Sequence, residues 1–344
     1  MDAALGAVLP PSTARARHAA QLSQNALLRT GVPALDGLLC GGLRTGEVCE
    51  VVGAPGSGKT SLCLAACAAQ AASSSSSASV LYLDTANGFR AKRLHEALRQ
   101  QGQHKPTRDD FQARRLRVAA APSLLSLLRH LETLEQRLDE PSQRLPAAAA
   151  ATATPPATAT NAAMPPAASA AAPSDDEFHA ALRLVVVDCV FSAVVAEGAG
   201  VSKTAAGAQL ARLQRLLRRL AAERRLAVLV TNLTVPVANA DDDAATHHAP
   251  GAAAPPHTRR PCKPALGVAW QHTADLRLHL TEPPPTPVTQ PAAAHTAAGA
   301  GAGPPLAPPL ARGLCVLKSC LNTRGVVEGE VASAPVCPVT GLFV

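Results

Sequence analysis

Aromatic residues are scarce in this chain of 344 residues, which has one Trp, one Tyr and five Phe, or 2% of the sequence. Proteins that hold single-stranded nucleic acid by base stacking do so on aromatic side chains. The composition therefore argues against an aromatic platform as the main way of binding single strands. Apolar runs are also short, and none approaches the length of about 18 residues that spans a bilayer, so we expect no membrane-spanning segment.

The nine cysteines form no CxxC pair, and their odd number does not suit a small secreted domain cross-linked by disulfides. The pattern therefore favours a reducing compartment. Cys63 and Cys67 lie four residues apart on a segment with helical character and could face a metal ion, but packing against a sheet is the favoured interpretation. His247, His248 and His257 fall in a stretch rich in Ala and Pro, where a solvated loop is favoured over a metal site.

Large apolar side chains are almost missing from three stretches rich in Ala, Pro and Thr, at residues 141–178, 237–261 and 281–311. Such segments cannot offset the conformational entropy that is lost when they become ordered, so we predict three low-complexity inserts. The remaining residues are enough for one well-buried domain. The net charge of +7 permits a polyanionic partner but does not establish one.

The segment GAPGSGKT, residues 53–60, has the full P-loop spacing of a glycine, four residues and then Gly-Lys-Thr. Residues 46–52 predict a strand before it and residues 61–72 a helix after it, which is the context that the motif requires. Lys59 is expected to reach the β- and γ-phosphates and Thr60 to ligate Mg²⁺, so we predict ATP and Mg²⁺ as cofactors. The predicted phosphate-binding residues are Gly53, Ala54, Pro55, Gly56, Ser57, Gly58, Lys59 and Thr60.

Strand and helix signals alternate along the first two thirds of the chain, which is typical of a parallel sheet with helices on both faces. Further strands are predicted at 79–85, 116–120, 182–190 and 226–232, and further helices at 89–100, 123–138 and 205–225. Segments at 273–280, 313–320 and 326–332 are predicted as antiparallel strands that close one edge of the sheet, the last two as a hairpin. The predicted fold class is α/β, with a mostly parallel sheet and antiparallel edge strands.

Asp188 ends the most apolar of these strands, directly after three valines. P-loop proteins need a second carboxylate at the end of a hydrophobic strand, where it holds the water shell of Mg²⁺ beside the P-loop threonine. Asp188 is therefore predicted as the second metal-site residue. The alternative is an aspartate that only caps the next loop.

Arg212, Arg215 and Arg219 lie on the polar side of the helix predicted at 205–225. These arginines could bind DNA, but a solvated helix face is favoured.

Five segments together resemble the RecA-type recombinases. Residues 27–64 hold a Thr-Gly, a Leu-Asp and a Gly-Leu pair ahead of the P-loop strand, and residues 80–94, 182–190 and 226–232 match the next core strands in order and spacing. Residues 263–270, with Lys-Pro-Ala-Leu-Gly and a tryptophan, are similar to the eukaryotic recombination paralogues of the D branch. The resemblance implies a RecA-like P-loop NTPase core at 27–344. Residues 1–26 are then expected to be a disordered tail, with the family's helical N-terminal domain absent.

The resemblance also implies two loops that face DNA. The first falls at 196–207 and carries Lys203, and the second runs over 234–264 with Arg259, Arg260 and Lys263 near its end. These cations could neutralise the phosphates of single-stranded or branched DNA without reading its sequence. Three aspartates at 241–243 oppose that attraction, so a solvated linker is the alternative.

Two residues depart from the pattern of active recombinases. Ala86 occupies the place of the glutamate that polarises the attacking water, and Leu233 stands where a glutamine senses the γ-phosphate. The acidic, proline-containing cap by which a neighbouring subunit covers ATP is not recognisable at 317–325. We therefore assign no catalytic residue and expect slow hydrolysis.

The resemblance and its departures predict an ATP-binding paralogue that assists homologous recombination and double-strand break repair in the nucleus. It would be a subunit of a complex with other RecA-like paralogues and a weak DNA-dependent ATPase. The first alternative is a fully active, filament-forming DNA-dependent ATPase and strand-exchange recombinase, against which Ala86 and Leu233 speak. The second is a small-molecule P-loop kinase, which would need a lid with arginines and an acceptor pocket.

Overall fold

The computed structural model describes residues 25–72, 78–101, 115–139, 174–197, 203–236, 262–281, 310–319 and 331–336. The helices are α2 (Pro33–Leu38), α3 (Lys59–Ala72), α4 (Ala91–Gln100), α6 (Leu124–Asp139), α7 (Asp175–Ala180), α8 (Val190–Glu197), α9 (Lys203–Arg224) and α10 (Gly267–Trp270). The strands are β1 (Leu27–Leu28), β2 (Leu43–Arg44), β3 (Val48–Gly53), β4 (Ser79–Asp84), β5 (Leu116–Ala120), β6 (Leu182–Asp188), β7 (Ala227–Pro236), β8 (Cys262–Pro264), β9 (Leu276–Thr281), β10 (Leu310–Ser319) and β11 (Val331–Val336). Most of the three predicted inserts and residues 1–24 of the expected tail lie outside these ranges.

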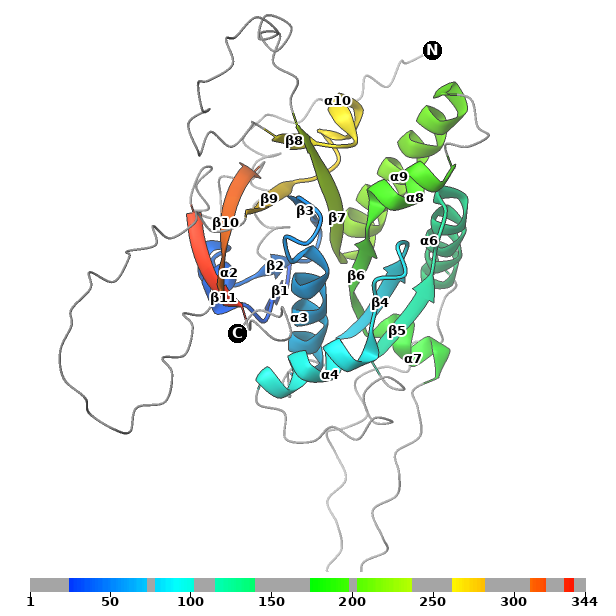
Figure 1. The fold of residues 1–344 in the computed structure, drawn as a ribbon. Coiled ribbons are helices and arrows are strands. Elements are labelled where there is room, and N and C mark those ends of the chain that lie inside the picture. Colours follow the sequence, from blue (N-terminus) through cyan, green and yellow to red (C-terminus); the bar gives the residue numbers. More distant parts are fainter. Residues whose placement is uncertain are drawn as a thin grey trace, which may run out of the picture.

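Within the described residues, nine strands form the central sheet in the order β11-β10-β9-β3-β7-β6-β4-β5, and β8 pairs with β7. From β9 to β5 the strands run parallel to one another, whereas β10 and β11 extend the sheet as antiparallel strands and β8 pairs antiparallel with β7. Figure 1 shows α3 and α4 on one face of the sheet and α6, α8 and α9 on the other. This arrangement confirms the predicted α/β fold.

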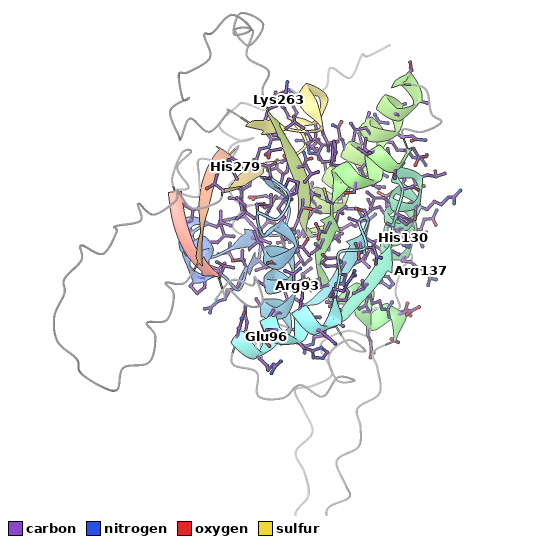
Figure 2. The ribbon with its side chains drawn as sticks, in the orientation of Figure 1. Arg93, Glu96, His130, Arg137, Lys263 and His279 are labelled. Carbon is purple, nitrogen blue, oxygen red and sulfur yellow. The ribbon has the colours of Figure 1, made fainter. Side chains whose placement is uncertain are left out.

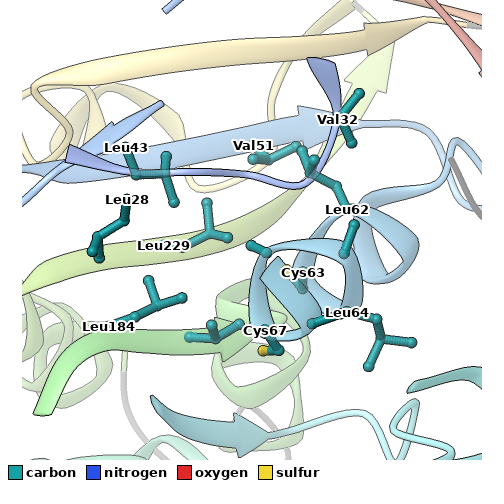
Figure 3. Close-up of a cluster of buried hydrophobic side chains, with 14 of the residues drawn as sticks. Leu28, Val32, Leu43, Val51, Leu62, Cys63, Leu64, Cys67, Leu184 and Leu229 are labelled. Carbon is teal, nitrogen blue, oxygen red and sulfur yellow. The ribbon is translucent and has the colours of Figure 1, made fainter. Parts of the chain in front are cut away.

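The apolar strands are buried because helices cover both faces of the sheet. Along β6, Leu184 and Val186 pack into the cluster on the α3 side, and Val185 and Val187 pack into the cluster on the side of α6 and α9. Figure 3 shows the first cluster, which includes Leu184 of β6 and Cys67 of α3. A strand buried on both faces is expected to be apolar throughout, and this explains the unbroken run that ends at Asp188.

The direction of β9 corrects the prediction at 273–280. That segment is predicted to be antiparallel; β9 pairs antiparallel with β10 but parallel with β3, with Val51 opposite Leu278. Side chains alternate in the same way in both kinds of strand, so the sequence pattern does not reveal the direction. The last strand is also displaced, because β11 begins at Val331 whereas the prediction spans 326–332. β9 ends at Thr281 and β10 begins at Leu310, so the predicted insert at 281–311 overlaps both strands.

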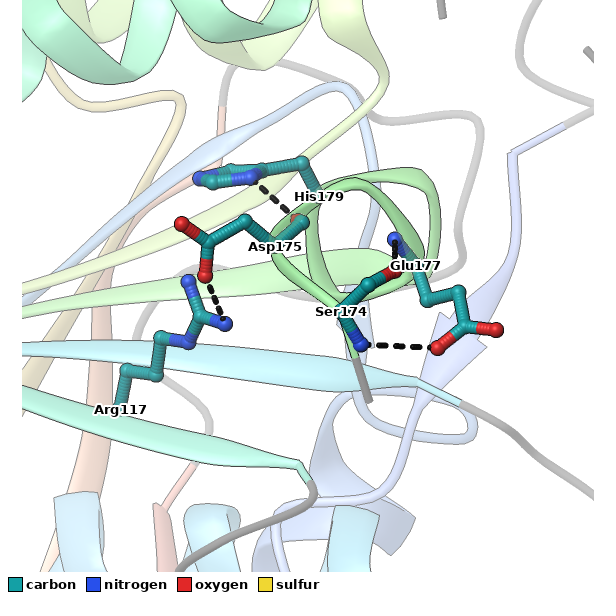
Figure 4. A network of polar contacts seen from close by, with 5 residues as sticks. All are labelled: Arg117, Ser174, Asp175, Glu177 and His179. Carbon is teal, nitrogen blue, oxygen red and sulfur yellow. Dashed lines mark hydrogen bonds and ion pairs between the residues drawn. The ribbon is translucent and has the colours of Figure 1, made fainter. Parts of the chain in front are cut away.

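α7 corrects the predicted insert at 141–178, because the helix begins inside it. Ser174 and Glu177 form a capping box, in which Ser174 Oγ accepts from the Glu177 N–H and Glu177 Oε2 accepts from the Ser174 N–H (Figure 4). Phe178 is buried, and the Arg117 guanidinium lies 4.1 Å from its ring centroid and bonds Asp175 at 2.7 Å. The prediction of a low-complexity insert followed the Ala- and Pro-rich composition of the stretch and did not use the Ser-x-x-Glu pattern of a helix N-terminus.

Ion pairs join the polar sides of α6 and α9. Arg212 pairs with Glu132 at 2.6 Å, and Arg219 pairs with Glu135. Arg215 is exposed and makes no such pair in the part of the chain that the structure describes. Two of the three arginines are thus neutralised by the protein, which favours the solvated helix face over DNA binding. Among the described helices, none has both the length and the apolar composition of a bilayer-spanning helix.

Candidate functional site

The P-loop connects the end of β3 to the start of α3, at the edge of the sheet where the parallel strands end. Gly53 has no room for a side chain, since a Cβ there would lie 2.5 Å from Ser57 Oγ and 2.8 Å from the carbonyl oxygen of Leu280. Gly56 and Gly58 have φ angles of 77° and 104°, which other residues rarely adopt. The loop is therefore a narrow backbone turn at a helix N-terminus, where N–H groups and the helix dipole favour an anion.

Lys59 is 7% exposed, and its ammonium donates to the carbonyl oxygens of Gly53 and Ala54, both at 2.8 Å. Burial lowers the pKa of Lys59 from its ordinary value of 10.5, and Cys189 and Asp188 oppose the shift. The Ser57 hydroxyl is buried and has no hydrogen-bond partner within the described residues. A buried cation and an unpaired hydroxyl at one loop fit a phosphate group.

Thr60 and Asp188 meet although 128 positions separate them: Thr60 Oγ1 donates to Asp188 Oδ2 at 2.7 Å. The two strands that flank β6 each contribute a further hydroxyl to the same carboxylate. Tyr82 of β4 donates to Oδ2 at 2.8 Å, and Thr231 of β7 donates to Oδ1 at 2.5 Å. Burial raises the pKa of Tyr82 well above its ordinary value, so the phenol stays protonated. The structure therefore brings the two predicted metal-site residues together.

The chemistry of this pair fits Mg²⁺, which prefers oxygen ligands and keeps several of its waters. No group of three His, Cys, Asp or Glu side chains that could hold a metal occurs in the described ranges, so phosphate oxygens and water would supply the remaining ligands. Cys63 and Cys67 are fully buried on α3 (Figure 3), and burial raises the pKa of both thiols. These cysteines pack in the core, as the sequence favours.

The loop after β4 passes beside Thr60 without a free carboxylate. Ala86 is exposed, and a Cβ built on Gly88 would lie 3.9 Å from the Thr60 hydroxyl oxygen. Asp84 ends β4, but its oxygens accept hydrogen bonds from the N–H groups of Ala86, Gly88 and Phe89 at 3.2, 3.0 and 2.9 Å. The Asp84 carboxylate therefore shapes the loop, with three of its acceptor sites used by backbone N–H groups.

Leu233 is half-buried within β7, and its N–H donates to Asn232 Oδ1 at 2.8 Å. Asn232 Nδ2 donates to Glu50 Oε1 at 2.8 Å. Trp270 Nε1 and Arg277 Nε also donate to the Glu50 carboxylate, at 2.9 and 2.6 Å. Glu50 is fully buried, so these donors replace the water that the carboxylate loses on folding. The cluster joins β3, β7, α10 and β9.

Two of the four predicted DNA-contacting residues lie in the described part of the chain. Lys203 is the first residue of α9, and α8 extends to Glu197, so the predicted loop at 196–207 is helical at both ends. Lys263 is exposed on β8, which pairs antiparallel with the end of β7 (Figure 2). β7 and β8 shorten the predicted loop at 234–264 on both sides. Arg259 and Arg260 lie outside the described residues.

Sequence reasoning misses Tyr82, Thr231 and Glu50. Each interrupts the apolar residues of its strand with a polar group at a buried position, and such a group needs a hydrogen-bond partner. That interruption is the signal that could have marked all three. The partner of each residue is not visible in the sequence, because it comes from another strand or from a distant helix.

Comparison with known proteins finds relatives that match the P-loop region and most of the chain. A sequence profile of the Rad51 family matches residues 21–124. The bovine (Bos taurus) protein named DNA repair protein RAD51 homolog 4 is 30% identical over 258 residues, which cover 75% of this chain and 62% of that protein. The mouse (Mus musculus) protein of the same name is also 30% identical over 258 residues, which cover 75% of this chain and 61% of that protein. The mouse DNA repair protein RAD51 homolog 2 is 33% identical over 130 residues, which cover 36% of this chain and 37% of that protein.

The chain thus spans less than two thirds of the length of the homolog 4 proteins that it matches. The matches confirm the resemblance to the eukaryotic recombination paralogues of the D branch. Together with the mostly parallel sheet and the P-loop at the end of β3, the matches indicate a RecA-like α/β core. Over three quarters of its length the chain is thus similar to proteins of the Rad51 family, whose profile matches residues 21–124.

Proposed function

We propose that this protein binds ATP with Mg²⁺ and acts in the nucleus as a recombination paralogue in DNA repair, within a hetero-oligomer of RecA-like paralogues. The relatives are named DNA repair proteins, which supports the repair role. The contact between Thr60 and Asp188 beside the P-loop, at 2.7 Å, carries the nucleotide-binding part. A hydroxyl and a carboxylate, the oxygen ligands that suit Mg²⁺, meet there at the start of α3, whose N-terminus would bind the phosphates.

The P-loop and Asp188 would hold different parts of the nucleotide and its metal ion. The backbone N–H groups from Gly53 to Thr60 would hold the phosphates, and the Lys59 ammonium would exchange its two carbonyl partners for phosphate oxygens. Thr60 and Asp188 would hold Mg²⁺. When bound, the ion neutralises charge on the β- and γ-phosphates.

ATP would be held and cleaved slowly. An attacking water needs an acceptor that orients it, and a positioned general base contributes on the order of 10²- to 10⁴-fold in rate. Ala86 offers no such acceptor, and Asp84 uses its oxygens for three backbone N–H groups. ATP would then act chiefly as a ligand that stabilises the fold or a subunit interface.

DNA binding would be weak, independent of sequence and sensitive to salt. The candidate contacts are cations, namely Lys203, Lys263, Arg259 and Arg260, and cations on phosphates give affinity without base specificity. Single-stranded or branched DNA is the proposed partner.

Calorimetry with ATP and Mg²⁺ tests the nucleotide site. Lys59→Ala should weaken binding about 10- to 100-fold, because it removes a charge-assisted contact worth about 1.5–3 kcal/mol. Lys263→Ala removes the same charge from exposed β8 and serves as the matched control, with unchanged ATP affinity expected. Equal affinity for ATP in the unmodified chain and in Lys59→Ala would contradict the P-loop assignment.

Affinity purification with mass spectrometry tests the partners. Recovery of a set of RecA-like paralogues would support the proposal. Recovery of metabolic enzymes alone would contradict it.

A further inference from the structure

Tyr82 lies in the interior of β4, in the apolar cluster that packs against α3. The side chain is fully buried, and its ring packs edge-on against Phe89, with ring centroids 5.2 Å apart. A phenylalanine would fill the same volume, so packing alone does not account for the hydroxyl. Within the described residues the hydroxyl has one hydrogen-bond partner, Asp188 Oδ2 at 2.8 Å.

The Asp188 carboxylate is held from both sides of its own strand. Thr231 of β7 donates to Oδ1 at 2.5 Å, and Tyr82 of β4 donates to Oδ2. Thr60 shares Oδ2 with Tyr82, at 2.7 Å. A threonine hydroxyl that binds a cation through its oxygen has only its proton left for Asp188. Tyr82 adds a second donor on Oδ2, so the position of the carboxylate does not depend on Thr60 alone.

The register of the sheet explains why a tyrosine can do this. Tyr82 lies opposite Val186 and Asp84 lies opposite Asp188, so Tyr82 is one pleat further from the edge than the carboxylate it contacts. The length of the phenol spans that step. Asp188 is 5% exposed, so water has little access to replace a lost donor.

We propose that Tyr82 is a positioning residue for the Mg²⁺ that accompanies the nucleotide, because its hydroxyl fixes the Asp188 carboxylate toward Thr60. The inference rests on the proposed Mg-ATP binding and adds to it a residue from a strand outside the two nucleotide motifs. Removal of a group that hydrogen-bonds to a metal ligand and orients it typically lowers metal affinity about 10- to 100-fold.

The test is the Mg²⁺ dependence of nucleotide binding in Tyr82→Phe, which removes one oxygen and keeps the ring. Binding of a slowly hydrolysed ATP analogue is titrated with Mg²⁺, so the readout does not depend on turnover. The Mg²⁺ concentration for half-maximal binding should rise about tenfold, while binding at saturating Mg²⁺ stays near that of the unmodified chain. Thr273→Val is the matched control, since Thr273 is buried and its hydroxyl has no partner within the described residues.

A double-mutant cycle separates positioning from a purely structural role. In an Asp188→Asn background, Tyr82→Phe should cause no further change in the Mg²⁺ dependence, because the carboxylate it positions is gone. Unchanged Mg²⁺ dependence in Tyr82→Phe, or a loss that is equal at every Mg²⁺ concentration, would overturn the inference while leaving the proposed function standing. Absence of analogue binding by the unmodified chain would contradict the proposed function and, with it, the inference.

Discussion

Replacing Arg277 with methionine removes the cation that pairs with Glu50 and keeps a side chain of similar length. Glu50 is fully buried and Arg277 is 7% exposed, with Nε and Oε2 2.6 Å apart. The carboxylate would be left with two neutral donors, Asn232 and Trp270. Loss of one partner from a buried ion pair costs about 3–5 kcal/mol, because the remaining charge is uncompensated. Since a domain of this size changes by about 2–4 °C per kcal/mol, the unfolding midpoint should fall by about 6–20 °C.

Trp270 provides the assay, because it is the single tryptophan of the chain and its indole N–H bonds to Glu50. Its fluorescence during thermal and denaturant unfolding reports the midpoint for each variant. The double variant Arg277→Met with Glu50→Gln removes the charge together with the cation and should recover more than half of the loss. Arg183→Met is the control, because Arg183 is the exposed residue of β6. A loss in Arg277→Met no larger than that in Arg183→Met would refute the reasoning.

Three further predictions concern the P-loop and strand β8. Gly53→Ala should abolish ATP binding and lower the unfolding midpoint, because its Cβ would lie 2.8 Å from the Leu280 carbonyl oxygen. Gly207→Ala on α9, whose Cβ would have nothing within 4 Å, should stabilise the protein by about 1 kcal/mol. Calorimetric scans compare the two variants, and an unchanged midpoint in Gly53→Ala would contradict the geometry. Burial lowers the pKa of Lys59, so between that lowered pKa and 10.5 the unfolded chain binds more protons than the folded chain, and the free energy of unfolding rises with pH. Lys59→Met should remove that rise in denaturant unfolding measured from neutral pH upward. An identical pH profile in the variant would contradict this prediction. Lys263→Glu should weaken DNA binding and flatten its dependence on salt, and an unchanged salt titration would remove β8 from the interface.

Local pattern was sufficient for the parts of the fold that depend on neighbouring residues. The valines before Asp188 predict a strand buried on both faces, and the structure has β6 there, covered by helices on each side. The glycine spacing at 53–60 predicts a loop between a strand and a helix, and β3 and α3 flank it. Each of these features is set by residues within one short segment.

Pairings across the fold are what the sequence does not reveal. The parallel direction of β9 depends on which strand lies beside it, and β3 is more than 200 positions away in the chain. The hydroxyl of Tyr82 and the carboxylate of Glu50 stand in apolar strands, and their roles become visible only when Asp188 and Arg277 are placed next to them. α7 was not predicted for a different reason: its only local signal is one capping box, which follows a long Ala- and Pro-rich stretch.

Single-turnover hydrolysis of bound ATP tests the central claim most directly, since that claim is nucleotide binding without rapid cleavage. The unmodified chain is loaded with ATP and Mg²⁺, with and without DNA, beside Ala86→Glu and Lys59→Ala. The unmodified chain should retain ATP, and Ala86→Glu should cleave it faster, by up to the 10²- to 10⁴-fold order of a positioned base. Rapid cleavage by the unmodified chain that Lys59→Ala abolishes would contradict the account and favour an active recombinase.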